Sequence, residues 1–334
     1  MKSENKSNRC AIKRTLLCAA AAAMLVSPMS AFAQAYPARA IRLVTEFIGG
    51  SGGDALLRLV MEPVGESMGQ PIIVDSRPGA GGLVAGELVA RADPDGYTWL
   101  GGAPNIHTVR PWVTRTNPFD TQKQLTPITT VAEPYLAVIA HTSVPARNMK
   151  ELIEHARRNP GKVAFATSGI GSTFHLDAEL IQMLAGIKMV HVPYKALQQA
   201  IGDVVSGVIP VSFTLAGQAK GFVNAGKLKA IAIVGEERYS EWPGVAPISE
   251  TVKGFEAPAA WTGLFGPAKL PRALVLRIYK EITISLANPA VKGKLSAIGI
   301  QPRGMTPEAF AANIKSQQAL IGKIVKSAGI KPVD

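Results

Sequence analysis

The sequence has almost no cysteine: Cys10 and Cys18 are its two cysteines, in a chain of 334 residues. This excludes a disulfide-rich framework, and a chain of this length needs neither disulfides nor a metal to stabilise its core. Strong compositional bias is also missing, because 18% charged and 47% hydrophobic residues exclude disordered, collagen-like and coiled-coil chains. A chain of this length is expected to split into two domains rather than to build one core.

No apolar run reaches the roughly 20 residues of a membrane-spanning helix. The longest run, residues 16–26, follows five basic residues and precedes the Ala-Phe-Ala sequence of residues 31–33. This pattern predicts a secretory signal peptide, residues 1–33, that is cleaved after Ala33. Cys18 lacks the small preceding residue of a lipidated cysteine. An exported mature chain without cysteine is expected in the periplasm of a bacterium.

The charge is unevenly distributed along the chain. There are 36 Lys and Arg against 24 Asp and Glu in the whole chain, and residues 262–334 alone carry 11 bases and 3 acids. These bases recur at helical spacing opposite apolar stripes, whereas a nucleic-acid groove would interleave bases with aromatic residues. We therefore expect solvated helix faces and no nucleic-acid partner.

Apolar runs of strand length alternate with amphipathic runs of helix length, which predicts an α/β fold with parallel strands. Strands are expected at residues 40–47, 71–75, 97–101, 136–140, 163–166, 189–192, 210–213 and 228–234. Helices are expected at residues 54–68, 83–91, 148–158, 173–184, 197–206, 271–286 and 307–326. Asn148 and Glu151 form a predicted capping box, and Thr306 is the predicted N-cap of the last helix.

Two loose stretches, residues 126–134 and 243–260, interrupt this alternation. They predict two extended crossings between two α/β lobes that enclose a cleft. The first lobe is expected to comprise residues 34–132 together with 260–334, and the second lobe residues 133–259. The last two helices are expected to pack back on the first lobe.

A glycine-rich turn, residues 47–54, joins the first predicted strand to the first predicted helix. Such a turn brings backbone N–H groups close to an anion at the helix N-terminus, where the dipole contributes about half a positive charge. Asp54 is expected to cap the helix. The alternative is a tight connection without any ligand.

The same turn contains the G-x-S-x-G pattern of a nucleophile elbow at Gly49, Ser51 and Gly53. An α/β-hydrolase places several strands before the elbow and a catalytic histidine late in the chain. Here the elbow would follow the first strand, and no histidine follows His191. An exported hydrolase that uses Ser51 remains the enzymatic alternative, and the turn matches neither a P-loop nor a dinucleotide-binding loop.

A second turn of Gly, Ser and Thr, residues 167–175, has the same position between a predicted strand and helix. Two helix N-termini that face each other across a cleft would bind carboxylates through backbone amides and hydroxyl groups. His175 is expected to orient this loop. The spacing of the histidines matches no metal motif, so we expect neither a metal nor a cofactor.

Besides these two loops, the chain contains five short segments in a specific order and spacing: residues 77–82, 94–98, 191–195, 225–228 and 261–265. In this order the chain resembles the substrate-binding proteins of tripartite tricarboxylate transporters, the Bug family, from residue 36 to about residue 331. The resemblance implies a type II periplasmic-binding-protein fold whose two lobes close on a small organic acid. It also implies delivery of this acid to a membrane permease.

The resemblance assigns ligand contacts to two loops and to three further positions: Phe47, Gly50, Ser51, Gly52, Gly53, Ser168, Gly171, Ser172, Thr173 and His175, with Asn105, Tyr194 and Thr214. Gly53 stands where the family usually has Thr or Ser, which would enlarge the pocket. Thr214 stands in place of an acid that can pair with the ligand's amine in amino-acid binders of the family. The predicted ligand is therefore an acid without an amine, a dicarboxylate or an aromatic carboxylate. Arg110 replaces a usual Asn and is interpreted as a charge on the rim.

Three classes of function remain. A monomeric binding protein explains the export signal and both loops, a hydrolase explains only Ser51, and a ligand sensor would present its closed form to a signalling receptor.

Overall fold

The structure, a computed structural model, describes residues 36–115 and 119–332. The predicted signal peptide with its cleavage site and both cysteines lie outside these residues. Within them, no helix is long and apolar enough to cross a membrane.

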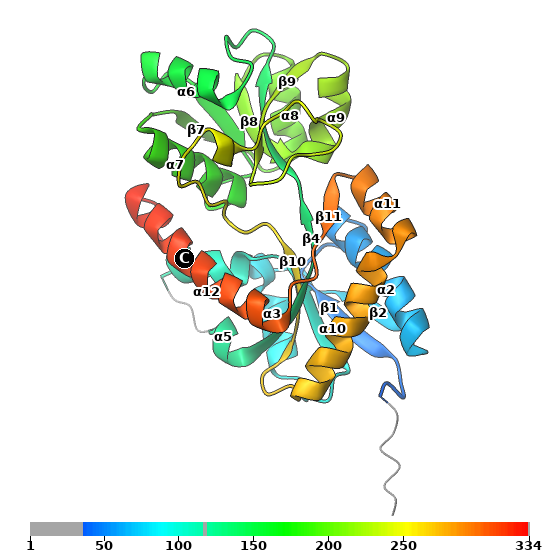
Figure 1. Ribbon diagram of the computed structural model, residues 1–334. Coiled ribbons are helices and arrows are strands. Elements are labelled where there is room, and N and C mark those ends of the chain that lie inside the picture. Colours follow the sequence, from blue (N-terminus) through cyan, green and yellow to red (C-terminus); the bar gives the residue numbers. More distant parts are fainter. Residues whose placement is uncertain (1–35, 116–118, 333–334) are drawn as a thin grey trace, which may run out of the picture. The chain divides into compact units, whose positions relative to one another are not determined.

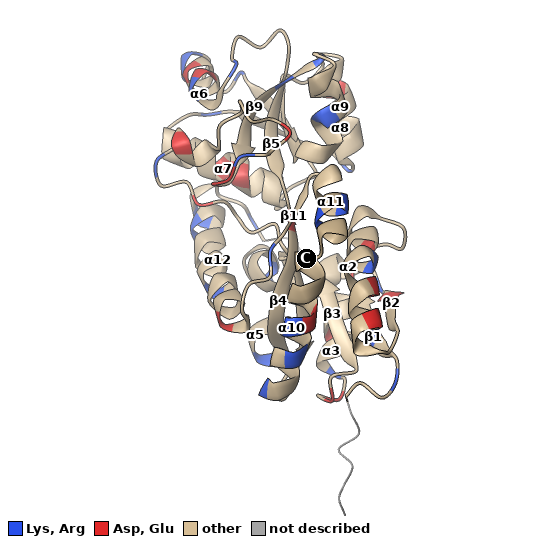
Figure 2. Ribbon diagram, turned by 45° about the vertical axis from the view of Figure 1, so that its right-hand side comes forward, with Lys and Arg blue, Asp and Glu red and all other residues tan. Residues whose placement is uncertain are grey.

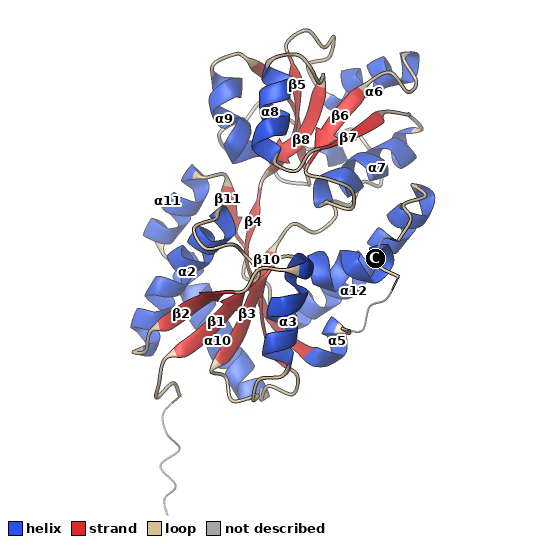
Figure 3. Ribbon diagram, turned by 180° about the vertical axis from the view of Figure 1, so that it is seen from behind, coloured by secondary structure: helices blue, strands red, loops and turns tan. Residues whose placement is uncertain are grey.

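From Arg39 onward the chain forms two β-sheets with helices on their faces (Figures 1 and 3). The first sheet has the strand order β11-β4-β10-β3-β1-β2. Its strands are β1 (Ile41–Thr45), β2 (Ile72–Ser76), β3 (Thr98–Gly102), β4 (Leu125–Pro134), β10 (Thr262–Pro267) and β11 (Ile300–Pro302). Its helices are α2 (Gly52–Met68), η1 (Ala80–Gly82), α3 (Leu83–Ala90), η2 (Asn105–Val109), α4 (Arg110–Val113), α5 (Thr121–Gln124), α10 (Arg272–Ala287), α11 (Pro289–Ala297) and α12 (Pro307–Ser327). These elements are called the first lobe.

The second sheet has the order β7-β6-β8-β5-β9, and with its helices it is called the second lobe. Its strands are β5 (Leu136–His141), β6 (Ala164–Thr167), β7 (Val190–Pro193), β8 (Val211–Leu215) and β9 (Leu228–Val234). Its helices are α6 (Met149–Arg158), α7 (Thr173–Ala185), α8 (Leu197–Val205), α9 (Ala216–Asn224) and η3 (Ile248–Glu250).

The predicted parallel strands are confirmed in both sheets. β1 pairs in parallel with β2 and β3, and β6 pairs in parallel with β7 and β8. Both sheets are nevertheless mixed, because β4, β10 and β11 pair antiparallel in one and β5 pairs antiparallel with β8 and β9 in the other. The first crossing is short: β4 ends at Pro134 and β5 begins at Leu136.

The helix caps correct the sequence prediction in two places. Ser51, not Asp54, is the N-cap of α2, and its Oγ accepts a hydrogen bond from the Asp54 N–H at 3.4 Å. Asn148 caps α6 as predicted, but the Glu151 carboxylate accepts from the N–H of Arg147 instead of that of Asn148. Thr306 caps α12 as predicted.

The C-terminal helices carry the basic excess on solvent-exposed faces, as the spacing predicted (Figure 2). Their packing differs from the prediction in one respect. α12 contacts β4 and η2 of the first lobe, but it also contacts α7 of the second. Its residues Ile321, Ile324 and Val325 share a buried core with Phe174 of α7, so this helix joins both lobes.

Candidate functional site

A cavity of about 270 Å³ lies where the two lobes meet. Its wall includes Pro134 at the end of the first crossing and Ala260 at the end of the second. The full lining consists of Ala103, Pro104, Asn105, Val109, Pro134, Leu136, Ser168, Gly171, Ser172, Thr173, Phe174, Leu215 and Ala260. Most of these side chains are apolar and none carries a charge, so the cavity fits a small ligand with an apolar body and a few polar groups.

The second loop supplies the polar part of this wall. Gly169 and Gly171 adopt positive φ angles of 115° and 76°, which turn the chain sharply from β6 into α7. Ser172 caps α7, because its Oγ accepts from the His175 N–H at 3.3 Å and donates to the Gly169 carbonyl at 2.8 Å. The N–H groups of Thr173 and Phe174 have no acceptor among the described residues. The positive end of the α7 dipole therefore opens on the cavity.

Two stacked histidines, His175 and His191, contact this loop and fix its conformation. The Gly171 N–H donates to Nδ1 of His175 at 3.1 Å, and the His175 ring stacks on His191 with centroids 4.0 Å apart. Nε2 of His191 lies 2.6 Å from Oγ1 of Thr167. Burial lowers the pKa of His191 to about 4, so this imidazole is neutral at pH 7. His175 thus positions the loop and does not itself line the cavity.

The first loop is tied to its own helix. The Gly50 N–H donates to Oδ2 of Asp54 at 2.9 Å, and Nε of Arg58 binds the same oxygen at 2.9 Å. This bond to Arg58 lowers the pKa of Asp54 below its usual range. The aromatic ring of Phe47 covers Gly53, where a Cβ atom would lie 2.5 Å from Cγ of the ring. The space that we expected Gly53 to open is therefore filled.

None of the five candidates of this loop, Phe47, Gly50, Ser51, Gly52 and Gly53, lines the cavity. By contrast, five other candidates do line it, namely Asn105, Ser168, Gly171, Ser172 and Thr173.

The remaining candidates lie outside the cavity wall. The Tyr194 hydroxyl donates to Oδ2 of Asp203 at 2.6 Å. Thr214 is buried in β8 opposite Ala137, and its hydroxyl has no partner among the described residues. Nη1 of Arg110 donates to the Ala80 carbonyl at 3.4 Å, and its buried Nε has no partner there either.

Sequence reasoning did not find the apolar part of the wall. In the sequence these apolar residues cannot be told apart from ordinary core residues; they are Pro104, Val109, Leu136, Phe174 and Leu215. The one usable signal was the location of the crossings, because Pro134 and Ala260 lie at their ends.

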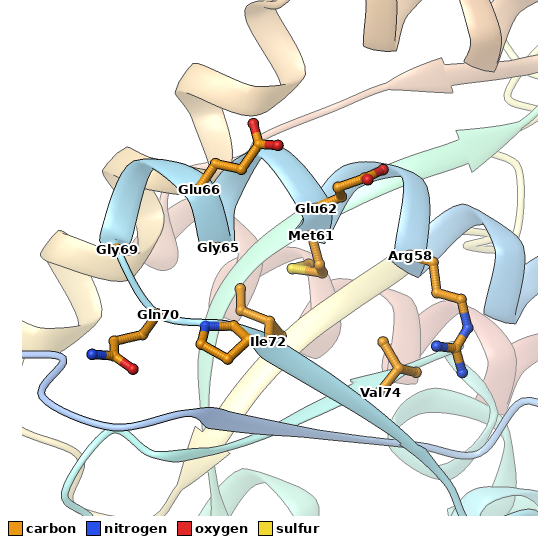
Figure 4. A pocket seen from close by; sticks show the side chains of 10 residues that line it. Arg58, Met61, Glu62, Gly65, Glu66, Gly69, Gln70, Ile72 and Val74 are labelled. Atoms are coloured by element: carbon orange, nitrogen blue, oxygen red, sulfur yellow. The ribbon is translucent and has the colours of Figure 1, made fainter.

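A larger hollow of about 610 Å³ lies elsewhere in the first lobe, between α2 and the edge strand β2 (Figure 4). Met61, Ile72 and Val74 lie between helix and strand, whereas Glu62 and Glu66 point away. Apart from these, only residues of the same helix and strand and their connection line it, and none is a predicted ligand contact. Within residues 36–115 and 119–332, no cluster of His, Cys, Asp and Glu could hold a metal ion.

Comparison with known proteins identifies the family. The family model described as the tripartite tricarboxylate transporter family receptor matches residues 56–330. This chain belongs to that receptor family. A UPF0065 protein of Bordetella bronchiseptica is 32% identical to this receptor over 96% of this chain and 95% of its own.

Two solved structures resemble this receptor along almost their whole length. The R. palustris protein Rpa4515 with adipate has a TM-score of 0.75 and 29% identity, covering 89% of this chain and 100% of its own. The periplasmic binding protein BugD has a TM-score of 0.71 and 27% identity, covering 89% and 100%. These findings confirm the predicted Bug family and the predicted α/β fold of two lobes, the type II periplasmic-binding-protein fold. The family is one of receptors, not of enzymes.

Proposed function

We propose that this receptor captures a small organic carboxylate without an amine in the cavity between its lobes. It then delivers this acid to the permease of a tripartite transporter. One observation carries the proposal: the α7 N-terminus, with the N–H groups of Thr173 and Phe174 unpaired among the described residues, opens on a cavity whose wall is otherwise mainly apolar.

A carboxylate in this cavity would accept hydrogen bonds from these two N–H groups and from the hydroxyl groups of Ser168 and Thr173. Hydrogen bonds to a charged group each contribute about 1.5–3 kcal/mol. The amide of Asn105, from the first lobe, would bind a second polar group of the ligand. The lining contains no Asp or Glu that could pair with an ammonium group, which supports an acid without an amine. The adipate complex of the R. palustris relative supports a dicarboxylate with an apolar body.

Binding and release require the lobes to open and close. We place the lobe boundaries at residues 34–132 with 260–334, and at 133–259. The backbone around Pro134 and Ala260 absorbs the change, as a hinge between two lobes does. The signal peptide expected from the sequence supports a periplasmic receptor, which we propose to be monomeric.

The hydrolase alternative has little support in the structure. Ser51 Oγ accepts the Asp54 N–H, and none of the described histidines hydrogen-bonds to it. Replacing Ser51 by Ala separates the two functions, because a hydrolase would lose nearly all turnover of ester substrates whereas a receptor loses only a helix cap.

Thermal unfolding of the mature protein, freed of ligand by unfolding and refolding, tests the proposed function. The panel contains succinate, adipate, malate, citrate, benzoate, aspartate and glutamate. At a hundredfold excess over its dissociation constant a ligand adds about 2.7 kcal/mol of stability, which raises the midpoint by several degrees. The proposal expects such a shift with an acid that lacks an amine. A shift with aspartate or glutamate alone, or with none of these acids, contradicts it.

A further inference from the structure

Glu46 lies directly behind the cavity wall. It follows β1, and its Oε1 accepts a hydrogen bond from the N–H of Ala103. Ala103 itself lines the cavity together with Pro104 and Asn105. This carboxyl group therefore contacts the backbone of a residue that lines the space the ligand would occupy.

The carboxyl group fits there because two glycines leave room for it. A Cβ atom at Gly102 would lie 2.9 Å from Oε1, and one at Gly82 would overlap Oε2. Gly82 also has a φ of 98°, in the left-handed region that favours glycine. β1, the turn before α3 and the end of β3 thus enclose the side chain.

No charged group compensates Glu46 among the described residues. The charged and titratable groups of the elements packed around it have other partners. Arg42 of β1 binds Asp75, Arg91 binds Glu87 of α3, Arg110 binds the Ala80 carbonyl, and His107 of η2 stacks on Phe265. β3 carries no charged residue. Burial therefore raises the pKa of Glu46 to about 7, against the smaller opposite effect of the Ala103 N–H.

We propose that Glu46 is the proton site of this receptor, so that the carboxylate ligand is captured together with a proton on Glu46. The proton comes from solvent and binds to Oε2, the oxygen that does not accept the Ala103 N–H. An ionised Glu46 repels an anion in the cavity across weakly polarisable protein, and protonation removes this repulsion. This inference rests on the proposed function, because it needs an anionic ligand in the cavity.

Affinity should therefore fall as the pH rises. For two like charges about 10 Å apart at an effective dielectric constant of about 20, the repulsion weakens binding about tenfold. We expect the dissociation constant of adipate to rise by about this factor between pH 6 and pH 9, a range in which adipate is ionised. Near pH 7.5 each binding event should take up a measurable fraction of a proton.

Isothermal titration calorimetry with adipate, in pairs of buffers of different ionisation enthalpy, measures both quantities. If adipate does not bind, the other acids of the panel are used in turn. Glu46→Gln keeps the shape and the Ala103 hydrogen bond but cannot ionise, so it should bind equally well from pH 6 to pH 9 without proton uptake. Glu62→Gln, at an exposed residue whose side chain points away from β2 in Figure 4, should behave like the wild type.

Each outcome decides between the two claims. The role of Glu46 is overturned if Glu46→Gln takes up as many protons on binding as the wild type does, or if the wild type takes up no proton. The proposed function then stays intact. Failure of every acid to bind overturns the proposed function and the coupling with it. Should Glu46→Gln not fold, the ¹³C carboxyl shift of Glu46 in the wild type, followed against pH with and without ligand, must show a ligand-induced rise of its pKa.

Discussion

The two glycine-rich loops have nearly the same sequence pattern but different structural roles. Each joins a strand to a helix, and each helix is capped by a serine, Ser51 on α2 and Ser172 on α7. The second loop lines the cavity and is held from behind by the pair of His175 and His191. The first loop has the same hydrogen bonds, since Asp54 accepts from the Gly50 N–H as His175 accepts from the Gly171 N–H, but the Phe47 ring covers Gly53 and no residue of this loop lines the cavity.

This difference shows that a glycine-rich turn before a helix does not by itself define a ligand contact. The first two helical N–H groups have no acceptor among the described residues in either loop, so what matters is whether a cavity lies in front of them. Of the two loops, the second lines the cavity between the lobes and the first does not.

A carboxylate introduced at the first residue of α7 or of α2 should give the largest difference between the loops in adipate affinity. Thr173→Asp puts a carboxylate where we propose that the ligand carboxylate binds. Repulsion of about 4 kcal/mol at about 4 Å predicts a loss of adipate affinity of a hundredfold or more. Thr173→Asp should fold, as should the control variant described next, because an acid at a helix N-terminus is favourable.

The matched control is Gly52→Asp on α2, where a Cβ atom meets nothing within 4 Å. Its affinity for adipate, measured by calorimetry, should stay within about threefold of the wild type. Equal losses in both variants would mean that both loops bind the ligand.

Acid should destabilise the second loop through His191. The folded protein holds the pKa of this imidazole near 4, below its ordinary value of 6.5. Between about pH 6.5 and pH 4 the unfolded chain binds a proton that the folded chain does not, so stability falls by up to about 3 kcal/mol as the pH falls. His191→Gln, followed by thermal unfolding from pH 7 to pH 4, should lose less stability than the wild type. An identical pH dependence would contradict this role.

The smallest effects should come from the two helix caps. Ser51→Ala and Ser172→Ala should each cost about 1 kcal/mol of unfolding free energy, measured by urea denaturation. Adipate affinity should fall about tenfold only in Ser172→Ala, because Ser172 also binds the Gly169 carbonyl and keeps the cavity wall in shape. Equal affinities in the two variants would show that the cap does not shape the site.

Periodicity predicted the regular elements well. The parallel strands β1 to β3 and the Thr306 cap of α12 follow from local pattern alone. The pattern missed several elements, among them β4, β10, β11, α9 and α11. β4 contains Pro127 and Pro134 and α9 contains Gly217 and Gly221, which break the usual composition of strands and helices. Their formation depends on pairing with distant residues, as β10 does with β3 and β4.

The site was predictable only in part, for the same reason. Both glycine-rich loops are visible in the sequence, whereas which of them lines the cavity depends on how the lobes pack and on the position of the Phe47 ring. Glu46 gave no signal at all, since its burial depends on Gly82 and Gly102, far along the chain.

The amide groups themselves provide the most direct test of the central claim, that the second loop binds the acid. In ¹⁵N-labelled protein titrated with adipate, or with the panel acid that stabilises the protein most, the amide protons of Thr173 and Phe174 should move downfield as they form hydrogen bonds to a carboxylate. Those of Gly52 and Gly53 should stay nearly unchanged. Shifts at Gly52 and Gly53 without any at Thr173 and Phe174 would contradict the account.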